Sequence, residues 1–167
     1  YLLGAVVASL FSASTFAADL EDRAAASRAA VKEFATSLQG ELSVAIKAGG
    51  PVNAIEVCSM VAPAIAADIS KKQGWKVARI SLKPRNPNNA PDAWETRVLK
   101  EFEARKAKGE DPAQMEHSEM IMGKGKHAFR YMKAIAIPAN APCLACHGEK
   151  IDPAVGAAVD VAIRALS

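Results

Sequence analysis

Two long stretches of the chain repeat their apolar residues every three or four positions, which predicts amphipathic helices. The first runs from about residue 19 to 48 and stops at a pair of glycines. The second begins at Pro51, a residue suited to the first helical turn, and runs to about residue 73. Pro63 should kink or split this helix because it removes a backbone donor. The residues that define the two stripes are Val31, Phe34, Leu38, Leu42, Ala45 and Ile46, then Ile55, Cys58, Ala62, Ile65 and Ile69.

The period of the pattern changes after residue 74. Residues 75–82 (WKVARISL) alternate as a strand does, and 83–92 form a loop rich in proline and asparagine. A third helix is expected from about 92 to 108, because Gly109 stops it. Two further strands, 115–122 and 126–135, flank a Gly-Lys-Gly turn.

This order of elements predicts one mixed α/β domain of the α+β type, with an antiparallel sheet flanked by helices. A loop that carries two cysteines and a short helix from 152 to 165 complete the chain. The length of 167 residues and an apolar share of 50% suit a single domain. The net charge of +3 comes without a basic run, so we expect no nucleic-acid partner. Three cysteines are too few, and odd in number, for a disulfide scaffold.

Residues 1–18 carry no charge and are typical of a secretory signal. An apolar run from Leu2 to Leu10 precedes small residues, with Thr15 and Ala17 placed at positions −3 and −1 of a cleavage site. The positive n-region and the initiator Met are missing, so we expect an incomplete signal, followed by the mature domain at 19–167. A membrane anchor is the alternative, but serine and threonine dilute this segment. We therefore expect export and no stable membrane span in the mature protein.

The segment 141–148 contains Cys143-x-x-Cys146-His147, the attachment motif of a c-type haem. Two cysteines three positions apart lie on one helical turn, where both thiols reach the haem vinyl groups. The histidine that follows then places its imidazole as the proximal iron ligand. Gly148 lets the backbone turn away without a side chain. The motif therefore predicts one covalent haem c, held by Cys143, Cys146 and His147.

Two other readings of this motif are weaker. A thioredoxin-like Cys-x-x-Cys should lie between a strand and a helix near the start of a fold, whereas this one lies near the end of the chain. A zinc site would add Cys58 and either His117 or His127 to the two motif cysteines, but these residues show no paired spacing.

The second axial ligand of the iron stays open on the residues alone. Methionines at strand spacing are more often core residues than ligands, and a cysteine on an apolar helix face is by default a small buried side chain. The candidates are Cys58, Met60, Met115, Met120, Met122, Met132, His117 and His127.

The chain resembles a family of small single-haem c-type proteins with a PAS-like fold, long catalogued as a domain of unknown function. The resemblance rests on residues 54–66, on 75–95 with its Arg-Asn-Pro-x-Asn and Pro-Asp-x-Trp-Glu motifs, on 129–135 and on 143–148. It implies a six-coordinate haem whose ligands are the histidine of the motif and a cysteine that corresponds here to Cys58. Members of the family occur alone in the periplasm and as sensor regions of membrane-bound signalling proteins. They continue past the last helix, so we expect a chain that is truncated at its C-terminus.

The resemblance implies a periplasmic protein that carries one electron or responds to redox state. A coordinatively saturated iron argues against an enzyme, and a thiolate ligand favours ferric iron and a low potential. One alternative is a haem-based gas or redox sensor that acts through a separate signalling partner. Another is a four-helix cytochrome of the c′ type, against which the strand-like 75–82 and the proline-rich loop speak.

Several residues outside the motif have two interpretations. Arg79 and Arg85 are candidate partners of the haem propionates, or solvated surface charges. Trp75, Trp94 and Tyr131 are expected in the core rather than against a haem. The long first helix could form a homodimer, or its stripe could pack on the protein's own sheet. Electron exchange would require a redox partner protein.

Overall fold

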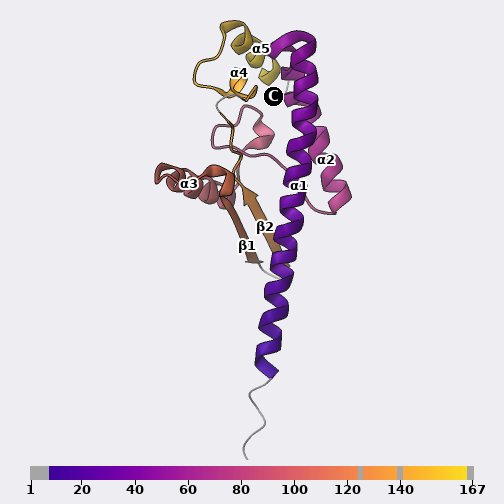
Figure 1. Ribbon diagram of the computed structural model, residues 1–167, viewed down its shortest axis with the longest axis vertical. Helices are drawn as coiled ribbons and strands as arrows, with labels where there is room; N and C mark the ends of the chain where they lie inside the picture. Colours follow the sequence, from indigo (N-terminus) through magenta and orange to yellow (C-terminus); the bar gives the residue numbers. More distant parts are fainter. Residues whose placement is uncertain (1–7, 124–125, 139–140, 165–167) are drawn as a thin grey trace, which may run out of the picture.

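The fold is built along one long helix, with the second helix packed on one side of it and the third helix and the hairpin on the other (Figure 1). The computed structural model describes residues 8–123, 126–138 and 141–164, without the side chains of 8–16 and 126. Helices dominate it, and a two-stranded sheet accompanies them. The elements are α1 (Ala8–Asn53), η1 (Val57–Val61), α2 (Ala62–Gln73), η2 (Pro87–Asn89), α3 (Ala93–Ala107), η3 (Pro112–Gln114), β1 (Glu116–Gly123), β2 (Lys126–Lys133), α4 (Leu144–His147) and α5 (Pro153–Arg164).

The first two predicted helices are confirmed, including the break between them. Gly49 and Gly50 leave helical geometry inside α1, and Gly50 has a φ of 73°, a conformation that glycine adopts without strain. Helical segments 17–53 and 57–73 are bent by 116° relative to one another. This bend returns the chain along α1, so that α2 packs beside it (Figure 1).

Pro63 splits the second helix, as predicted, and the break takes the form of a π-helical turn. This turn, η1, spans Val57–Val61 and contains Cys58. A proline ring clashes with the carbonyl four residues before it, which is that of Ser59, and a wide turn relieves such a clash. Cys58 therefore lies in a local irregularity rather than in a regular helix.

Three small clusters of buried side chains form the core. One joins α1 to α2, the second joins the kink region to η1, and the third joins α3 to the hairpin. Their buried members are Ala30, Phe34, Ala62 and Ile69; Leu42, Ala54 and Val57; and Val98, Phe102 and Met115. The apolar stripe of α1 thus packs against α2 and, further along the helix, against the kink region and η1 of the same chain.

The strand predicted at 75–82 is wrong. The segment runs between α2 and the loop that follows it, where single contacts replace a ladder. The Ser70 hydroxyl accepts from the Val77 N–H at 2.8 Å, and the Ser81 N–H donates to the Asn89 carbonyl at 3.1 Å. Alternating side chains therefore reflect packing between two non-strand elements, not membership of a sheet.

The predicted hairpin is confirmed: β1 and β2 pair antiparallel from Glu116 opposite Lys133 to Gly123 opposite Lys126. Residues 124–125 of its turn lie outside the described residues. The predicted third helix is confirmed as α3, which a reciprocal capping box between Asp92 and Glu95 begins. The fold is therefore α+β, which differs from the four-helix bundle of the c′ alternative.

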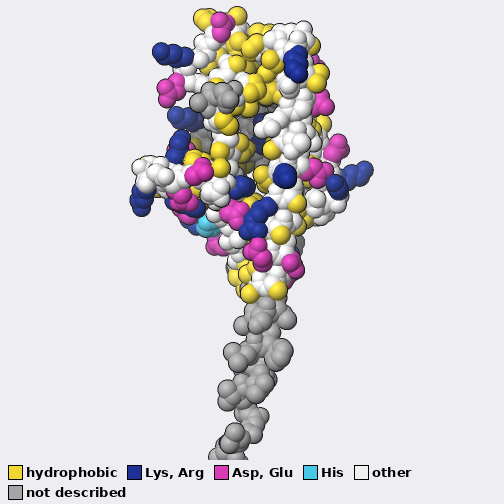
Figure 2. All heavy atoms as spheres, viewed as in Figure 1, with side chains coloured by type: hydrophobic (Ala, Val, Ile, Leu, Met, Phe, Trp, Pro, Cys, Tyr) yellow, Lys and Arg dark blue, Asp and Glu magenta, His cyan; other side chains and the backbone are white. Residues whose placement is uncertain are grey.

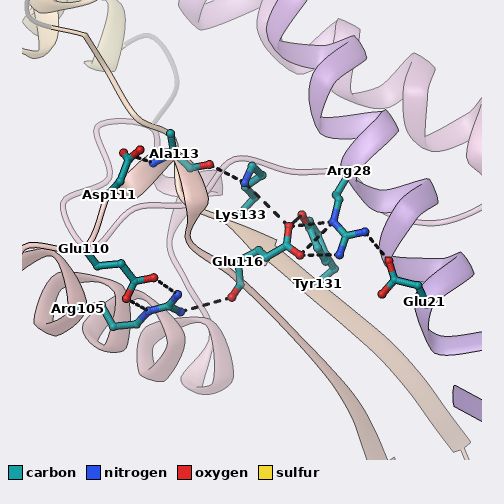
Figure 3. A network of polar contacts seen from close by, with 9 residues as sticks. All are labelled: Glu21, Arg28, Arg105, Glu110, Asp111, Ala113, Glu116, Tyr131 and Lys133. Atoms are coloured by element: carbon teal, nitrogen blue, oxygen red, sulfur yellow. Dashed lines mark hydrogen bonds and ion pairs between the residues drawn. The ribbon is translucent and has the colours of Figure 1, made fainter.

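A polar network fastens the hairpin to α1 (Figure 3). Arg28 on α1 donates to both carboxylate oxygens of Glu116 on β1, at 2.7 and 3.0 Å, and the Tyr131 hydroxyl donates to the same carboxylate at 2.7 Å. The hydrogen bond from Arg28, followed by that from Tyr131, lowers the pKa of Glu116 to about 2 despite its partial burial. The two ends of this bridge lie 88 residues apart in the chain.

Residues 1–7 of the predicted signal lie outside the described residues, and the described backbone from residue 8 is continuous with α1. Among the described helices, none is long and apolar enough by itself to cross a bilayer; segments 17–53 and 57–73 meet that criterion only as a bent pair.

Candidate functional site

The Cys143-x-x-Cys146-His147 motif folds as a single helical turn. Cys143 is the N-cap of α4, and its carbonyl accepts from the Cys146 N–H at 3.2 Å and from the His147 N–H at 2.8 Å. Both cysteines are half-buried and not in a disulfide. The turn therefore presents two thiols and one imidazole from five consecutive residues, as the sequence predicts.

Gly148 ends this turn at a place where a side chain does not fit. Its N–H donates to the Leu144 carbonyl at 2.9 Å, and a Cβ atom at position 148 would lie only 2.5 Å from the same oxygen. A backbone carbonyl cannot move aside as a flexible side chain can. Glycine is therefore required if the chain is to leave α4 directly after His147.

Cys58 joins this site from a position 85 residues before Cys143 in the chain. It packs on the cluster of Leu42, Ala54 and Val57, and Cys143 packs on the same cluster. Burial raises the pKa of the Cys58 thiol; the Arg79 charge opposes this rise, and the nearby motif cysteines add to it. The structure thus gathers Cys58 and Cys143 on one apolar cluster, and Cys146 lies close enough to Cys58 to affect the pKa of its thiol.

The two predicted arginines both contact this group. An Arg79 Nη2 N–H donates to the Cys58 carbonyl at 3.2 Å, and the Arg79 guanidinium lies 5.8 Å from the centre of the Phe34 ring. The Arg85 Nη1 contacts His147 Nδ1 at 2.7 Å. The loop between α2 and α3 therefore supplies one cation beside each candidate iron ligand.

The His147 side chain is exposed to solvent, and Arg85 and Arg79 lie near it. Partial burial, together with the positive charges of Arg85 and Arg79, lowers the pKa of its imidazole. Since a guanidinium offers only donors, Nδ1 is the acceptor in the contact with Arg85. The neutral imidazole is the form that binds metal, and Nε2 is the nitrogen that this contact leaves free.

Asn86 is a site residue that the sequence analysis did not single out. Its side-chain oxygen accepts from the Asn88 N–H at 2.9 Å and begins the short helix η2 at Pro87. This turn sets the direction of the loop next to Arg85. The Asn-Pro pair in the loop is the sequence signal that indicates such a turn.

The other candidate ligands lie mostly on or beside the hairpin, in contacts of their own. Met115 is 1% exposed in the α3 cluster, whereas Met122 is 72% exposed. His117 stands edge-on to Trp94, with 5.7 Å between ring centres, and contacts Glu119 at 3.4 Å. Across the hairpin, His127 is exposed and pairs with Met122, and Met120 and Met132 belong to the same two strands. Met60 alone lies near Cys58, in η1, and its side chain is 61% exposed.

Consequently, the zinc combination of the three cysteines with His117 or His127 is not assembled. Over residues 8–123, 126–138 and 141–164, no group of three or more histidine, cysteine or acidic side chains could hold a metal ion. Among the aromatic residues, Trp94 packs on the third core cluster and Tyr131 is half-buried. The expectation of a core position for Trp75 is wrong: this residue is 39% exposed, because no sheet covers residues 75–82.

Apolar side chains gather at the end of the molecule that carries α5, whereas charged groups surround the hairpin region (Figure 2).

The chain matches the Tll0287-like family over residues 14–158. It belongs to the Tll0287-like family. The match includes most of α1, the loop with both arginines, the hairpin and the Cys-x-x-Cys-His turn. This member of the Tll0287-like family therefore has its whole candidate site inside the family region. No curated protein and no solved structure matches the chain.

Proposed function

We propose that this Tll0287-like protein is a periplasmic c-type haem protein that transfers one electron or responds to redox state. A single haem would be attached through thioethers to Cys143 and Cys146. The observation that carries the proposal is the convergence of Cys58 with the Cys-x-x-Cys-His turn on one apolar cluster. A chance occurrence of the motif would not explain why the remaining cysteine, from another part of the chain, lies there.

The residues present fit such a group. Two half-buried thiols lie on one turn, an imidazole follows them, and Gly148 leaves no side chain where the chain departs. Bound haem supplies a one-electron Fe(III)/Fe(II) couple. We propose His147 as the proximal ligand and Cys58 as the second axial ligand. The thiolate of Cys58 carries a negative charge that stabilises the ferric form, and this predicts a low potential.

Arg79 and Arg85 are the proposed partners of the haem propionates. Neither guanidinium forms an ion pair with a carboxylate among the residues that the structure describes. Guanidinium groups pair well with carboxylates, and two cations at the site are suited to the two propionates of a haem. Their contacts to Cys58 and His147 would place these charges near both axial ligands.

If His147 and Cys58 both held the iron, no position would remain open for a substrate, and we therefore propose an electron carrier rather than an enzyme. Its partner would be a redox protein of the same compartment. The PAS-like architecture belongs to this proposal as well: it rests on the family resemblance, and the hairpin held between α1 and α3 supports the coarser α+β class.

A second candidate is a haem-based sensor of gas or redox state, and the position of Cys58 in a π-turn favours it. Such turns interrupt the regular hydrogen bonds of an α-helix and recur at functional sites. A ligand held by this turn could leave the iron more easily than one on a regular helix. The sensor would act through a separate signalling partner.

Absorption spectra of the oxidised and reduced protein test the main proposal, after expression with cytochrome c maturation machinery. We expect a c-type pyridine haemochrome and haem that survives acid-acetone extraction. The variants Cys143→Ala and Cys146→Ala should each lose stable attachment. Complete extraction of haem from the unsubstituted protein would show that the thioether assignment is wrong.

A further inference from the structure

A cavity of about 380 Å³ opens between the η1–α2 helix and the segment 77–89. Arg79 and Ser59 bring it next to Cys58, but Cys143, Cys146 and His147 are not among its lining residues. It is therefore a neighbour of the candidate haem site rather than the site itself. Its volume lies at the lower end of the range for small-molecule pockets, about 300–1,000 Å³, so it suits a small ligand.

The polar wall of the cavity carries one positive charge and several amides. Arg79 is half-buried, and of its five N–H donors one is used on the Cys58 carbonyl. No carboxylate of the described residues pairs with it. The side-chain amides of Asn88 and Asn89, which also line the cavity, make no hydrogen bond within the described part of the chain. These groups are free to bind a ligand that has an anionic end.

The rest of the lining is largely aliphatic. Met60, Pro63, Ala66 and Val77 are part of it, and no acidic residue lines the cavity. A single cation suits one carboxylate rather than a polyphosphate, which needs several positive charges. The small side chains of α2 leave room for a short hydrocarbon segment beside this charge. Charge and shape together therefore select a ligand with one carboxylate and a few methylene groups.

We propose that this cavity binds a short aliphatic carboxylate, with the carboxylate on Arg79, the amides of Asn88 and Asn89 at its polar edge, and the hydrocarbon on α2. Two sources have this chemistry: the propionate arm of a haem, or a small carboxylic acid from the surroundings. Only the first source rests on the proposed function; the second would occupy Arg79 and leave Arg85 as the partner of the haem propionates. The inference assigns a binding role to the cavity, to its two asparagine amides and to its apolar lining. The proposed role of Arg79 as a propionate partner includes none of these.

The test begins with a titration of the haem-loaded protein with butyrate, in which isothermal calorimetry measures the binding. A free carboxylate site predicts saturable binding that Arg79→Gln weakens about tenfold or more, because a charged hydrogen-bonding partner is lost. Ala67→Leu should also weaken binding, since it narrows the cavity and leaves Arg79 in place. This second variant keeps the test valid if Arg79→Gln does not fold. Lys83→Gln is the matched control: it removes an exposed charge outside the cavity and should bind butyrate normally.

The second arm distinguishes the source. If butyrate does not bind, a haem propionate in the cavity predicts that the propionate bending band in the resonance Raman spectrum shifts in Arg79→Gln and in Ala67→Leu, but not in Lys83→Gln. Absence of both butyrate binding and a band shift would overturn the inference. Haem content is measured first by pyridine haemochrome. Absence of covalent haem from the unsubstituted protein would contradict the proposed function. Butyrate binding to the same protein could still be measured, so the two failures are distinguishable.

Discussion

Arg85 and His147 lie 62 residues apart in the chain, and their side chains meet at 2.7 Å between Nη1 and Nδ1. The contact places a positive charge beside the His147 imidazole, which we propose as the proximal iron ligand. A cation at this distance disfavours further positive charge nearby, which is why it contributes to the lowered pKa of His147. The same electrostatics should act on the charge of a bound iron.

Removal of the Arg85 charge should therefore lower the midpoint potential. Ferric iron carries one more positive charge than ferrous iron, so Arg85→Gln relieves a repulsion that is larger in the oxidised state. We expect a decrease on the order of tens of millivolts, measured by spectroelectrochemistry. Lys83→Gln removes an equal charge from an exposed position and is the control. An equal shift in the two variants would mean that the Arg85–His147 contact has no special effect on the iron.

Replacement of Cys58 should change both the potential and the access to the iron. A thiolate favours ferric iron. Each tenfold increase in its affinity for ferric over ferrous iron lowers the potential by about 59 mV for one electron. Cys58→Ala should raise the potential, admit carbon monoxide or imidazole, and abolish the thiolate signature in the low-spin ferric electron resonance spectrum. Cys58→Met should also raise the potential while keeping six-coordination, because a thioether is neutral. An unaltered ferric spectrum in Cys58→Ala, with a mild loss of stability, would identify Cys58 as a packing residue only.

A methyl group at position 148 should disturb haem attachment. The Cβ of Gly148→Ala would lie 2.5 Å from the Leu144 carbonyl oxygen, so α4 or His147 must move. We expect a lower yield of covalent haem and an altered ferric spectrum. Gly40→Ala is a matched control, since its Cβ would meet nothing within 4 Å on α1. That control should keep the spectrum and increase the unfolding free energy by about 0.5–1 kcal/mol. Equal haem yields in both variants would contradict the requirement for glycine at 148.

Acid should weaken the attachment of the hairpin to α1. The pKa of Glu116 is held at about 2 in the folded protein, below its ordinary value of 4.5, so this carboxylate stabilises the fold at higher pH. Its contribution should decline as the pH falls from about 5 towards 2. Because Arg28 and Glu116 are 40% and 30% exposed, solvent screening limits the contribution to about 1 kcal/mol or less.

Chemical denaturation of the unsubstituted protein and of Glu116→Gln at several pH values measures this contribution. The difference in unfolding free energy should be largest near neutral pH and shrink below pH 4. Tyr131→Phe, which removes one donor to the same carboxylate, should give a smaller difference with the same pH dependence. A difference that does not change between pH 7 and pH 3 would show that the Glu116 charge does not stabilise the fold.

Local chemistry explains the features that the sequence alone determined. The Gly49-Gly50 break, the split at Pro63, the start of α3 near Asp92 and the β1–β2 hairpin each depend on residues close together in the chain. The Cys-x-x-Cys-His turn belongs to the same class, because five consecutive residues define its geometry. Backbone preferences and short-range hydrogen bonds suffice for such elements, and a pattern of residues is enough to predict them.

The tertiary structure alone decided which distant groups meet. Residues 75–82 have the alternation of a strand, but a strand also needs a partner edge, and here Ser70 and Asn89 supply single contacts instead. The gathering of Cys58 with Cys143, and of Arg85 with His147, depends on the bend after α1 and on the path of the loop after α2. These are long-range consequences of how three small cores pack, and no local pattern encodes them.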